Sequence, residues 1–359
     1  MNFYWNAFGP VNLGLDLAIT FTFFMLAFLN SRLQPAKTRL TVCRQALLGA
    51  VALWVMAGAY IGGIIGFSLI ARMFWTLCTA AIPLLLAFFA ARDRKALLLL
   101  PALLLLACKF YGEIYEPNNL EVRRATITVG GLKEPVKLAH ISDLQTDGTG
   151  AMHAEVLRQV NGYEPEFIFF TGDVLNHPSL VPEIQAYLQG FKSRQGSFFV
   201  GGNVDGGLQL KEFFKSTGFV VLDGDYRKIK TRAGTLGIVG LGLGDYGDRR
   251  LLQKLLAGLG STDATLLLSH VPDAMRTAAG LPVTALFSGH THGGQVCLPW
   301  FGPVVTLSGV SRGIAAGGIH KSDGLYVIVS RGLGLEGQIA PRVRTFCSPQ
   351  ILLLELKPE

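Results

Sequence analysis

Long apolar runs dominate the first part of the chain, whereas the rest alternates between short apolar runs and amphipathic segments. The apolar stretches lie at Val11–Leu29, Gln45–Phe67, Met73–Ala91 and Ala96–Phe110. The first three have about the 20 residues that a helix needs to cross a bilayer core, and the fourth is shorter. Met1–Pro10 carries no charge, which disfavours a signal peptide. We therefore expect a transmembrane region of about four helices.

Beyond residue 112 the pattern changes to that of a folded α/β domain. Glu113–Asn119 contains Pro117-Asn118-Asn119 and indicates a linker. Candidate helices are Ala151–Asn161, Leu180–Ser193, Leu208–Ser216, Asp248–Leu259 and Pro272–Ala279. Candidate strands include Gly234–Leu241, Leu325–Ser330 and Ile351–Leu356. Strands and helices in alternation predict β-sheets with helices packed outside. The predicted organisation is a transmembrane domain at 1–112, a linker at 113–122 and a second domain at 123–359.

The charge of the chain is confined to its apolar part. The 359 residues are 50% hydrophobic, with a net charge of +7. Residues 1–112 hold nine Lys or Arg and two Asp or Glu, so they account for the whole excess. The remainder is neutral, which disfavours a nucleic-acid partner, because such binding depends on clustered cations that neutralise phosphates.

Basic residues in the short loops predict the orientation in the membrane. They are Arg32, Lys37, Arg39 and Arg44 in the first loop and Arg92, Arg94 and Lys95 in the third. Cytoplasmic loops are enriched in such residues, so the N-terminus and the large domain are expected outside the cytoplasm. Arg72, placed between the second and third stretches, is the exception. If the short fourth stretch only lies in the interface, the domain changes sides.

Several short apolar strands end in residues that can bind a metal. Ser288-Gly289-His290-Thr291-His292-Gly293-Gly294-Gln295 places two imidazoles beside a glycine turn that allows close approach. Similar endings follow three other strands and a histidine follows a fourth. These residues are Asp143 and Gln145, Asp173, Asn203 with Asp205, and His270. Their recurrence predicts one metal centre assembled from all five strand ends.

These motifs resemble the calcineurin-like metallophosphoesterases, and in particular a membrane-anchored bacterial branch of that superfamily. Ser269-His270-Val271-Pro272-Asp273 and Ser330-Arg331-Gly332-Leu333-Gly334 are similar to segments of that branch. The resemblance covers roughly residues 120–357. It implies a four-layer α/β/β/α sandwich with ligands on loops at the strand ends, and a location in the bacterial cytoplasmic (inner) membrane.

The resemblance also implies two divalent metal ions, such as Mn, Fe or Zn. The residues expected around the first are Asp143, Gln145, Asp173 and His292. Those expected around the second are Asp173, Asn203, His270 and His290. Asp173 is shared because a carboxylate can bridge two cations. Mixed nitrogen and oxygen ligation suits these metals better than calcium.

Two positions depart from the family pattern. Gln145 replaces a histidine, which implies a weaker first site, or no site if the glutamine only bonds to its loop. Val204 replaces a histidine that helps to protonate the leaving group. General acid catalysis is worth about 10²–10⁴ in rate, so the expected substrate is a phosphodiester or a pyrophosphate, whose leaving group departs as a stable anion. His177 is either a substitute proton donor or a solvated loop residue.

The predicted function is a membrane-anchored phosphoesterase that hydrolyses a lipid or a lipid-linked head group. The resemblance implies attack by a hydroxide that bridges the two metals, with Asp173, Asn203 and Asp205 as catalytic residues and Arg331 as a substrate-binding residue. Two alternatives stay open. One is a UDP-2,3-diacylglucosamine pyrophosphohydrolase of lipid A synthesis, and the other is a degenerate binding protein without activity. A disulfide between Cys297 and Cys347 is also left open, and no oligomeric state is predicted.

Overall fold

The structure is a computed structural model that describes residues 10–34, 37–335 and 339–359. The chain divides into two compact units, which are described separately. One unit contains the apolar helices up to Tyr115 together with the segment Glu336–Val343. The other consists of Glu116–Leu335 and Arg344–Glu359. The domain boundaries given above, with a linker at 113–122, stay a prediction.

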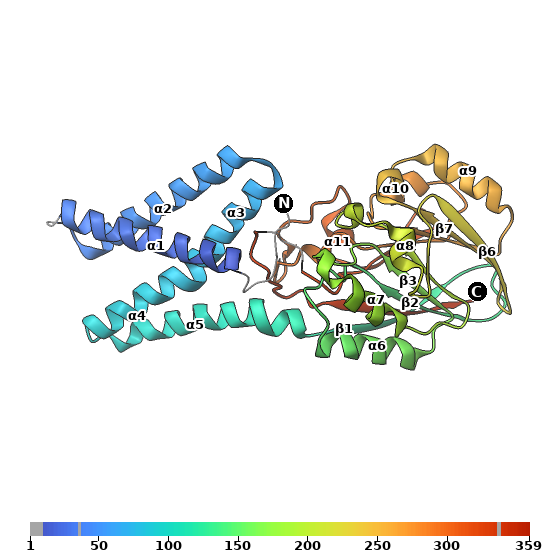
Figure 1. Cartoon of the computed structure of the whole chain (residues 1–359), viewed down its shortest axis with the longest axis horizontal. Helices are drawn as coiled ribbons and strands as arrows, with labels where there is room; N and C mark the ends of the chain where they lie inside the picture. Colours follow the sequence, from blue (N-terminus) through green and yellow to red (C-terminus); the bar gives the residue numbers. More distant parts are fainter. Residues whose placement is uncertain (1–9, 35–36, 336–338) are drawn as a thin grey trace. The chain divides into compact units, whose positions relative to one another are not determined.

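Four helical stretches of the first unit are long and apolar enough to cross a membrane. They are Val11–Leu33, Arg39–Ile61, Gly63–Arg92 and Ala96–Asn118 within the described part of the chain. The elements that form them are α1 (Pro10–Leu33), α2 (Arg39–Ile61), α3 (Gly63–Thr76), η1 (Leu77–Ala81), α4 (Ile82–Arg92), η2 (Ala96–Leu98), α5 (Leu99–Phe110), η3 (Tyr111–Tyr115) and η4 (Glu116–Asn118) (Figure 1). Arg39 pairs with Asp93 at 2.7 Å, so the two basic loops meet at one end of this unit.

The boundary predicted between the second and third stretches is wrong. The second stretch was expected to run to Phe67, but α2 ends at Ile61 and Phe67 belongs to α3. Gly62 and Gly63 have φ of 69° and 56°, a left-handed conformation that glycine adopts without a steric penalty. A pair of such residues ends one helix and begins the next.

Arg72 is consequently inside a helix and not in a loop. Its side chain is only 3% exposed, and its guanidinium lies 3.0 Å from both carboxylate oxygens of Asp16. The same group donates to the carbonyl oxygens of Ile339 and Ala340, while the Thr76 hydroxyl donates to Asp16 at 2.6 Å. A charged residue among apolar helices is tolerated when it is paired in this way.

The second unit is the four-layer α/β/β/α sandwich that the sequence predicted. One sheet has the order β1-β14-β2-β3-β4-β5 and the other β12-β13-β9-β8-β7-β6. The strands of the first are β1 (Glu121–Thr128), β14 (Gln350–Lys357), β2 (Val136–Ile141), β3 (Phe167–Thr171), β4 (Gly196–Val200) and β5 (Phe219–Val221). Those of the second are β12 (Gly318–Ser322), β13 (Leu325–Val329), β9 (Ala285–Ser288), β8 (Ala264–Ser269), β7 (Gly234–Leu241) and β6 (Asp225–Thr231).

Both faces of the central strands are apolar because each sheet packs on two sides. In β3, Phe167 and Phe169 enter the core between the sheets, whereas Ile168 and Phe170 pack outward. Helices α6 (Ala151–Tyr163), α7 (Val181–Gln189) and α8 (Leu210–Phe214) cover the first sheet, and α9 (Arg249–Leu259) and α10 (Ala274–Ala278) cover the second (Figure 1). Side chains that alternate between two buried faces produce continuous apolar runs.

The pairing of Arg72 with Asp16 gives a testable expectation for stability. Arg72→Leu leaves the Asp16 carboxylate without its cation and should cost about 3 kcal/mol of stability. Asp16→Leu combined with Arg72→Leu should recover part of that loss, because no uncompensated charge remains. Unfolding midpoints of the three purified proteins in detergent measure this. Strictly additive losses would contradict a direct interaction between the two side chains.

Candidate metal centre

The ligand-type residues follow the C-terminal ends of strands from both sheets. Strands β2, β3 and β4 run parallel in one sheet, and β7, β8, β9 and β13 run parallel in the other. Because each polar motif comes directly after one of these strands, the motifs gather at the same edge of the sandwich. The residues that they supply are Asp143, Gln145, Asp173, Asn203, His270, His290 and His292.

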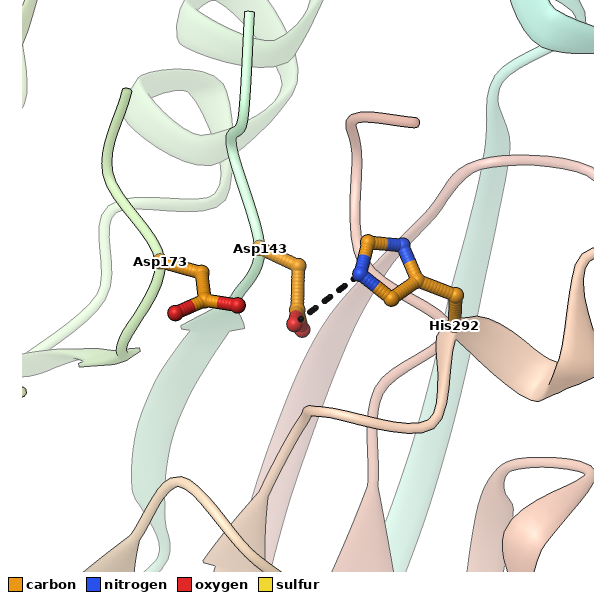
Figure 2. A group of neighbouring side chains, drawn as sticks. All are labelled: Asp143, Asp173 and His292. Carbon is orange, nitrogen blue, oxygen red and sulfur yellow. Dashed lines mark ion pairs between the residues drawn. The ribbon is translucent and has the colours of Figure 1, made fainter. Parts of the chain in front are cut away.

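The group predicted for the first metal converges. Asp143, Asp173 and His292 each offer one ligand atom, and these three atoms lie within 4.8 Å of one another (Figure 2). All three side chains are buried, and His292 Nε2 lies 3.4 Å from Asp143 Oδ1. Gln145 Nε2 donates to Asp173 Oδ2 at 2.9 Å. Gln145 Oε1 is buried and has no hydrogen-bond partner within the described residues.

The group predicted for the second metal also converges. Asn203 Oδ1 lies 2.9 Å from both His270 Nε2 and His290 Nδ1. His270 Nε2 is 3.4 Å from Asp173 Oδ2. His270 Nδ1 donates to the Thr171 carbonyl at 2.7 Å, which leaves Nε2 as the nitrogen directed at the other groups. Asn203 is exposed and His290 half-buried, so this side of the centre is open to solvent.

The backbone at the centre is held in a conformation that is costly for residues with a side chain. Asp143, Gln145, Asp173, His290 and His292 have φ of 48°, 26°, 60°, 68° and 48°. Non-glycine residues occupy this region rarely, and a strained backbone persists only where the surroundings fix it. Backbone hydrogen bonds fix it here, such as the one from His290 N to Asp143 Oδ1 at 3.0 Å.

Glycines next to the ligands allow the loops to approach closely. A Cβ on Gly289 would lie 1.8 Å from Ser142 Oγ and 2.2 Å from Asp143 Oδ2. A Cβ on Gly202 would lie 2.2 Å from Asp173 Oδ1. No side chain fits at these two positions without moving a carboxylate of the centre.

Asp205 binds the backbone of two loops that carry ligand residues. Its carboxylate accepts hydrogen bonds from the backbone N–H groups of Asp173, Val174 and Gly202 at 2.7–2.8 Å. Burial, together with the nearby Asp173 carboxylate, raises the pKa of Asp205 to about 6. The carboxylate therefore holds two ligand-bearing loops together, and its predicted catalytic role stays a prediction.

The electrostatics of the centre suit a bound cation. Burial raises the pKa of Asp143 to about 7, and Asp173 adds to the effect. Burial lowers the pKa of His270, but the Asp173 carboxylate outweighs it and the pKa rises to about 10. Two buried carboxylates thus attract positive charge. A divalent cation would supply it, and the unpartnered Gln145 Oε1 would be an additional oxygen donor.

Other residues singled out in the sequence have local partners. His177 accepts a hydrogen bond from Ser179 N at 3.1 Å and caps the short helix η5 (Pro178–Leu180). Arg331 lies beside Gly293, but its guanidinium pairs with Glu121 of β1. Its role in substrate binding stays a prediction. Cys297 and Cys347 are both free thiols in this structure.

The buried side chain of Arg344 supports the turn that contains His290 and His292, here called the histidine turn. Its guanidinium donates to the carbonyl oxygens of Arg331 and Gly334 at 2.8 Å and of His292 at 3.4 Å. A fully buried guanidinium that donates to several backbone carbonyls stabilises the loop that carries them. No short sequence motif distinguishes this role from the binding of an anion.

Comparison with known proteins agrees with this geometry. The family model for calcineurin-like phosphoesterases matches residues 136–294, which include every residue of both groups. Residues 136–294 thus form a calcineurin-like phosphoesterase domain. Proteins of this family are phosphoester hydrolases that use divalent metal ions.

The phosphoesterase domain has relatives in several bacteria. The chain is 27% identical over 265 residues to the uncharacterised metallophosphoesterase YkuE of Bacillus subtilis. The aligned region covers 69% of this chain and 89% of that protein. A second uncharacterised metallophosphoesterase of that organism, YkoQ, is 27% identical over 236 residues, with 61% and 86% covered. The UDP-2,3-diacylglucosamine pyrophosphatase LpxG of Chlamydia trachomatis is 32% identical over 152 residues, with 40% and 43% covered.

The close approach at Gly289 predicts a specific defect. Gly289→Ala forces the Asp143 carboxylate to move, and metal affinity should fall by about tenfold or more. Gly247→Ala is the matched control, because nothing lies within 4 Å of the added Cβ. Competition with a chelator measures the affinity of each protein for Mn²⁺. If Gly289→Ala binds Mn²⁺ as tightly as the control does, the carboxylate does not contact the ion.

Proposed function

We propose that the phosphoesterase domain holds two divalent metal ions and hydrolyses a phosphodiester or a pyrophosphate in a lipid or a lipid-linked substrate. The observation that carries this proposal is the convergence of the two ligand groups. Asp143, Asp173 and His292 meet within 4.8 Å, and Asn203, His270 and His290 adjoin them. This convergence also argues against a degenerate binding protein, because a chain released from catalysis has no physical reason to keep its ligand residues together.

Each residue has a role that follows from its contacts. Asp143, Gln145 and His292 hold one ion, Asn203, His270 and His290 hold the other, and Asp173 lies between the two groups. When bound, such ions activate water and neutralise charge on the phosphate oxygens. The Thr171 carbonyl fixes the tautomer of His270, and Asp205 fixes the backbone of Asp173. The substrate enters on the side of Asn203 and His290, which is open to solvent.

Val204 limits the range of leaving groups. Its side chain is 37% exposed and has no ionisable proton. Its backbone N–H donates to Asp173 Oδ1 at 2.9 Å. His177 caps η5 through its Nδ1, and its role as a substitute proton donor stays a prediction. A leaving group that needs a proton therefore departs slowly. This favours a diester or a pyrophosphate over an alkyl monoester.

The four apolar helices support a membrane anchor and hence a substrate in the membrane. The two basic loops meet through Arg39 and Asp93, which places their positive charge at the same end of the helices. Positive loops favour the cytoplasmic side, so we place the phosphoesterase domain on the extracytoplasmic side of the cytoplasmic membrane. An enzyme tethered in this way meets lipid substrates at high local concentration.

The relative named LpxG gives a second candidate function, which is hydrolysis of the pyrophosphate of UDP-2,3-diacylglucosamine. Both candidate substrates have a pyrophosphate or a phosphodiester next to an apolar group. The same residues of the metal centre would therefore act on either substrate. Release of UMP from that substrate by the purified protein distinguishes the second candidate from the first.

Hydrolysis of soluble esters tests the proposal. With Mn²⁺, the full chain should cleave bis-p-nitrophenyl phosphate and act poorly on phosphoserine. Val204→His restores a proton donor and should raise the rate on phosphoserine by about 10²-fold, with little change for the aryl diester.

Two control variants complete this test. Val204→Gln adds a polar side chain that is no general acid, and it should not raise the phosphoserine rate. Asp173→Asn should remove activity on both esters. Equal rates of the unmodified chain on both esters would contradict the inference from Val204, and an active Asp173→Asn protein would contradict the metal centre.

A further inference from the structure

An uncharged and apolar segment directly follows the metal-binding turn. Between Gly293 and Ser311 the sequence has no Asp, Glu, Lys, Arg or His. The part from Val296 to Leu307, here called the apolar loop, contains the short paired strands β10 (Cys297–Leu298) and β11 (Gly302–Pro303). The apolar loop therefore lies between two polar positions of the sequence, His292 before it and Arg312 after it.

The large side chains of the apolar loop point into solvent. Trp300, at the tip between the two strands, is 104% exposed, and Phe301 is 54% exposed. Leu298, Val304 and Leu307 are exposed as well. Single exposed apolar residues are common in soluble proteins, but a run of large ones around a fully exposed tryptophan indicates an interaction surface.

The apolar loop is attached to the metal centre through the backbone. Val304 N donates to Val296 O at 3.0 Å, and Cys297 N donates to Thr345 O at 2.9 Å. Thr345 N in turn donates to Gln295 O at 2.9 Å, directly after the histidine turn. Phe346, next to Thr345, is exposed and extends the apolar surface. What binds to the loop is thus held at a fixed distance from the metal centre.

A groove connects the two features. It has a volume of ≈ 550 Å³ and includes both His290 of the metal centre and Leu307 of the apolar loop. Its other lining residues are Leu243, Tyr246, Val271, Asp273, Ser308 and Gly309. Asp273 accepts hydrogen bonds from Ser308 Oγ at 2.6 Å and from Gly309 N at 3.1 Å, which fixes this wall. Its size is typical of sites for small ligands.

We propose that the apolar loop docks on the surface of a lipid bilayer and that the groove takes the apolar part of a phospholipid whose phosphate lies at the metal centre. The proposal deepens the proposed function, on which it rests for the phosphate chemistry. Trp and Phe favour the membrane interface, where an aromatic ring meets both apolar and polar groups.

Two further observations favour a bilayer over a protein partner. The guanidinium of Arg312 lies 4.0 Å from the centre of the Phe301 ring, so a cation sits beside the exposed aromatics where lipid phosphates would be. The chain also has four helices that are long and apolar enough to span a membrane, so a bilayer is always within reach of the tethered domain.

The fluorescence of Trp300 tests the docking without using catalysis. In the full chain, Trp5, Trp54 and Trp75 are replaced by Phe, and the protein is placed in nanodiscs of phosphatidylcholine with and without brominated acyl chains. We expect the brominated lipid to quench Trp300. The matched control carries Trp300→Phe and Val220→Trp in the same background, because Val220 is 40% exposed on β5 and should not be quenched. Unchanged circular dichroism and Mn²⁺ content show that both proteins are folded.

Kinetics provide the second arm. Trp300→Ser with Phe301→Ser should lower the rate on phosphatidylglycerol vesicles, relative to the rate on bis-p-nitrophenyl phosphate, by about tenfold or more, since two apolar anchors are lost. An unquenched Trp300, or an unchanged ratio of rates, would overturn the proposal. Trp300 emission that shifts only with protein concentration would overturn it in favour of a second copy of the chain. Quenching in a protein that cleaves neither ester would support the docking and refute the proposed function instead.

Discussion

Two hydrogen bonds that join the sheets determine the geometry of the metal centre. Asp143 follows a strand of the first sheet and accepts the backbone N–H of His290, which follows a strand of the second. In the opposite direction, His270 of the second sheet donates to the Thr171 carbonyl of the first. The two halves of the sandwich are therefore fixed at the edge where the ligands lie. Without these bonds the aligned strand ends would bring the ligands close but would not orient them.

Interactions elsewhere in the fold offset the conformational free energy that this orientation costs. Five ligand residues have a left-handed backbone, and each such residue costs on the order of 1–3 kcal/mol. Buried strands on both sides, the backbone bonds to Asp205 and the guanidinium of Arg344 keep these loops in place. A centre that is formed before the ion arrives loses little entropy when it binds, and the phosphate meets ligands that are already positioned.

Much of this could be predicted from the sequence because the signals are local. Apolar runs that end in Asp, Asn or His identify the strands and the ligand set. The features that were missed depend on distant partners. Arg331 follows β13 of one sheet and pairs with Glu121 of β1 in the other, 210 positions away. Arg72 was placed in a loop because its partner Asp16 lies in another helix and the Gly62-Gly63 break was not recognised.

The chain thus combines a rigid metal centre with apolar helices and an exposed apolar loop, all of which suit a substrate at a membrane surface. The central claim is that both ligand groups hold ions. Anomalous diffraction from crystals grown with Mn²⁺ tests it directly. The account predicts two peaks about 3.5–4 Å apart, with Asp173 between them. One peak should touch Asp143 and His292, and the other His270 and His290. No peak at these side chains, in a crystal where they keep the arrangement described here, would contradict the account.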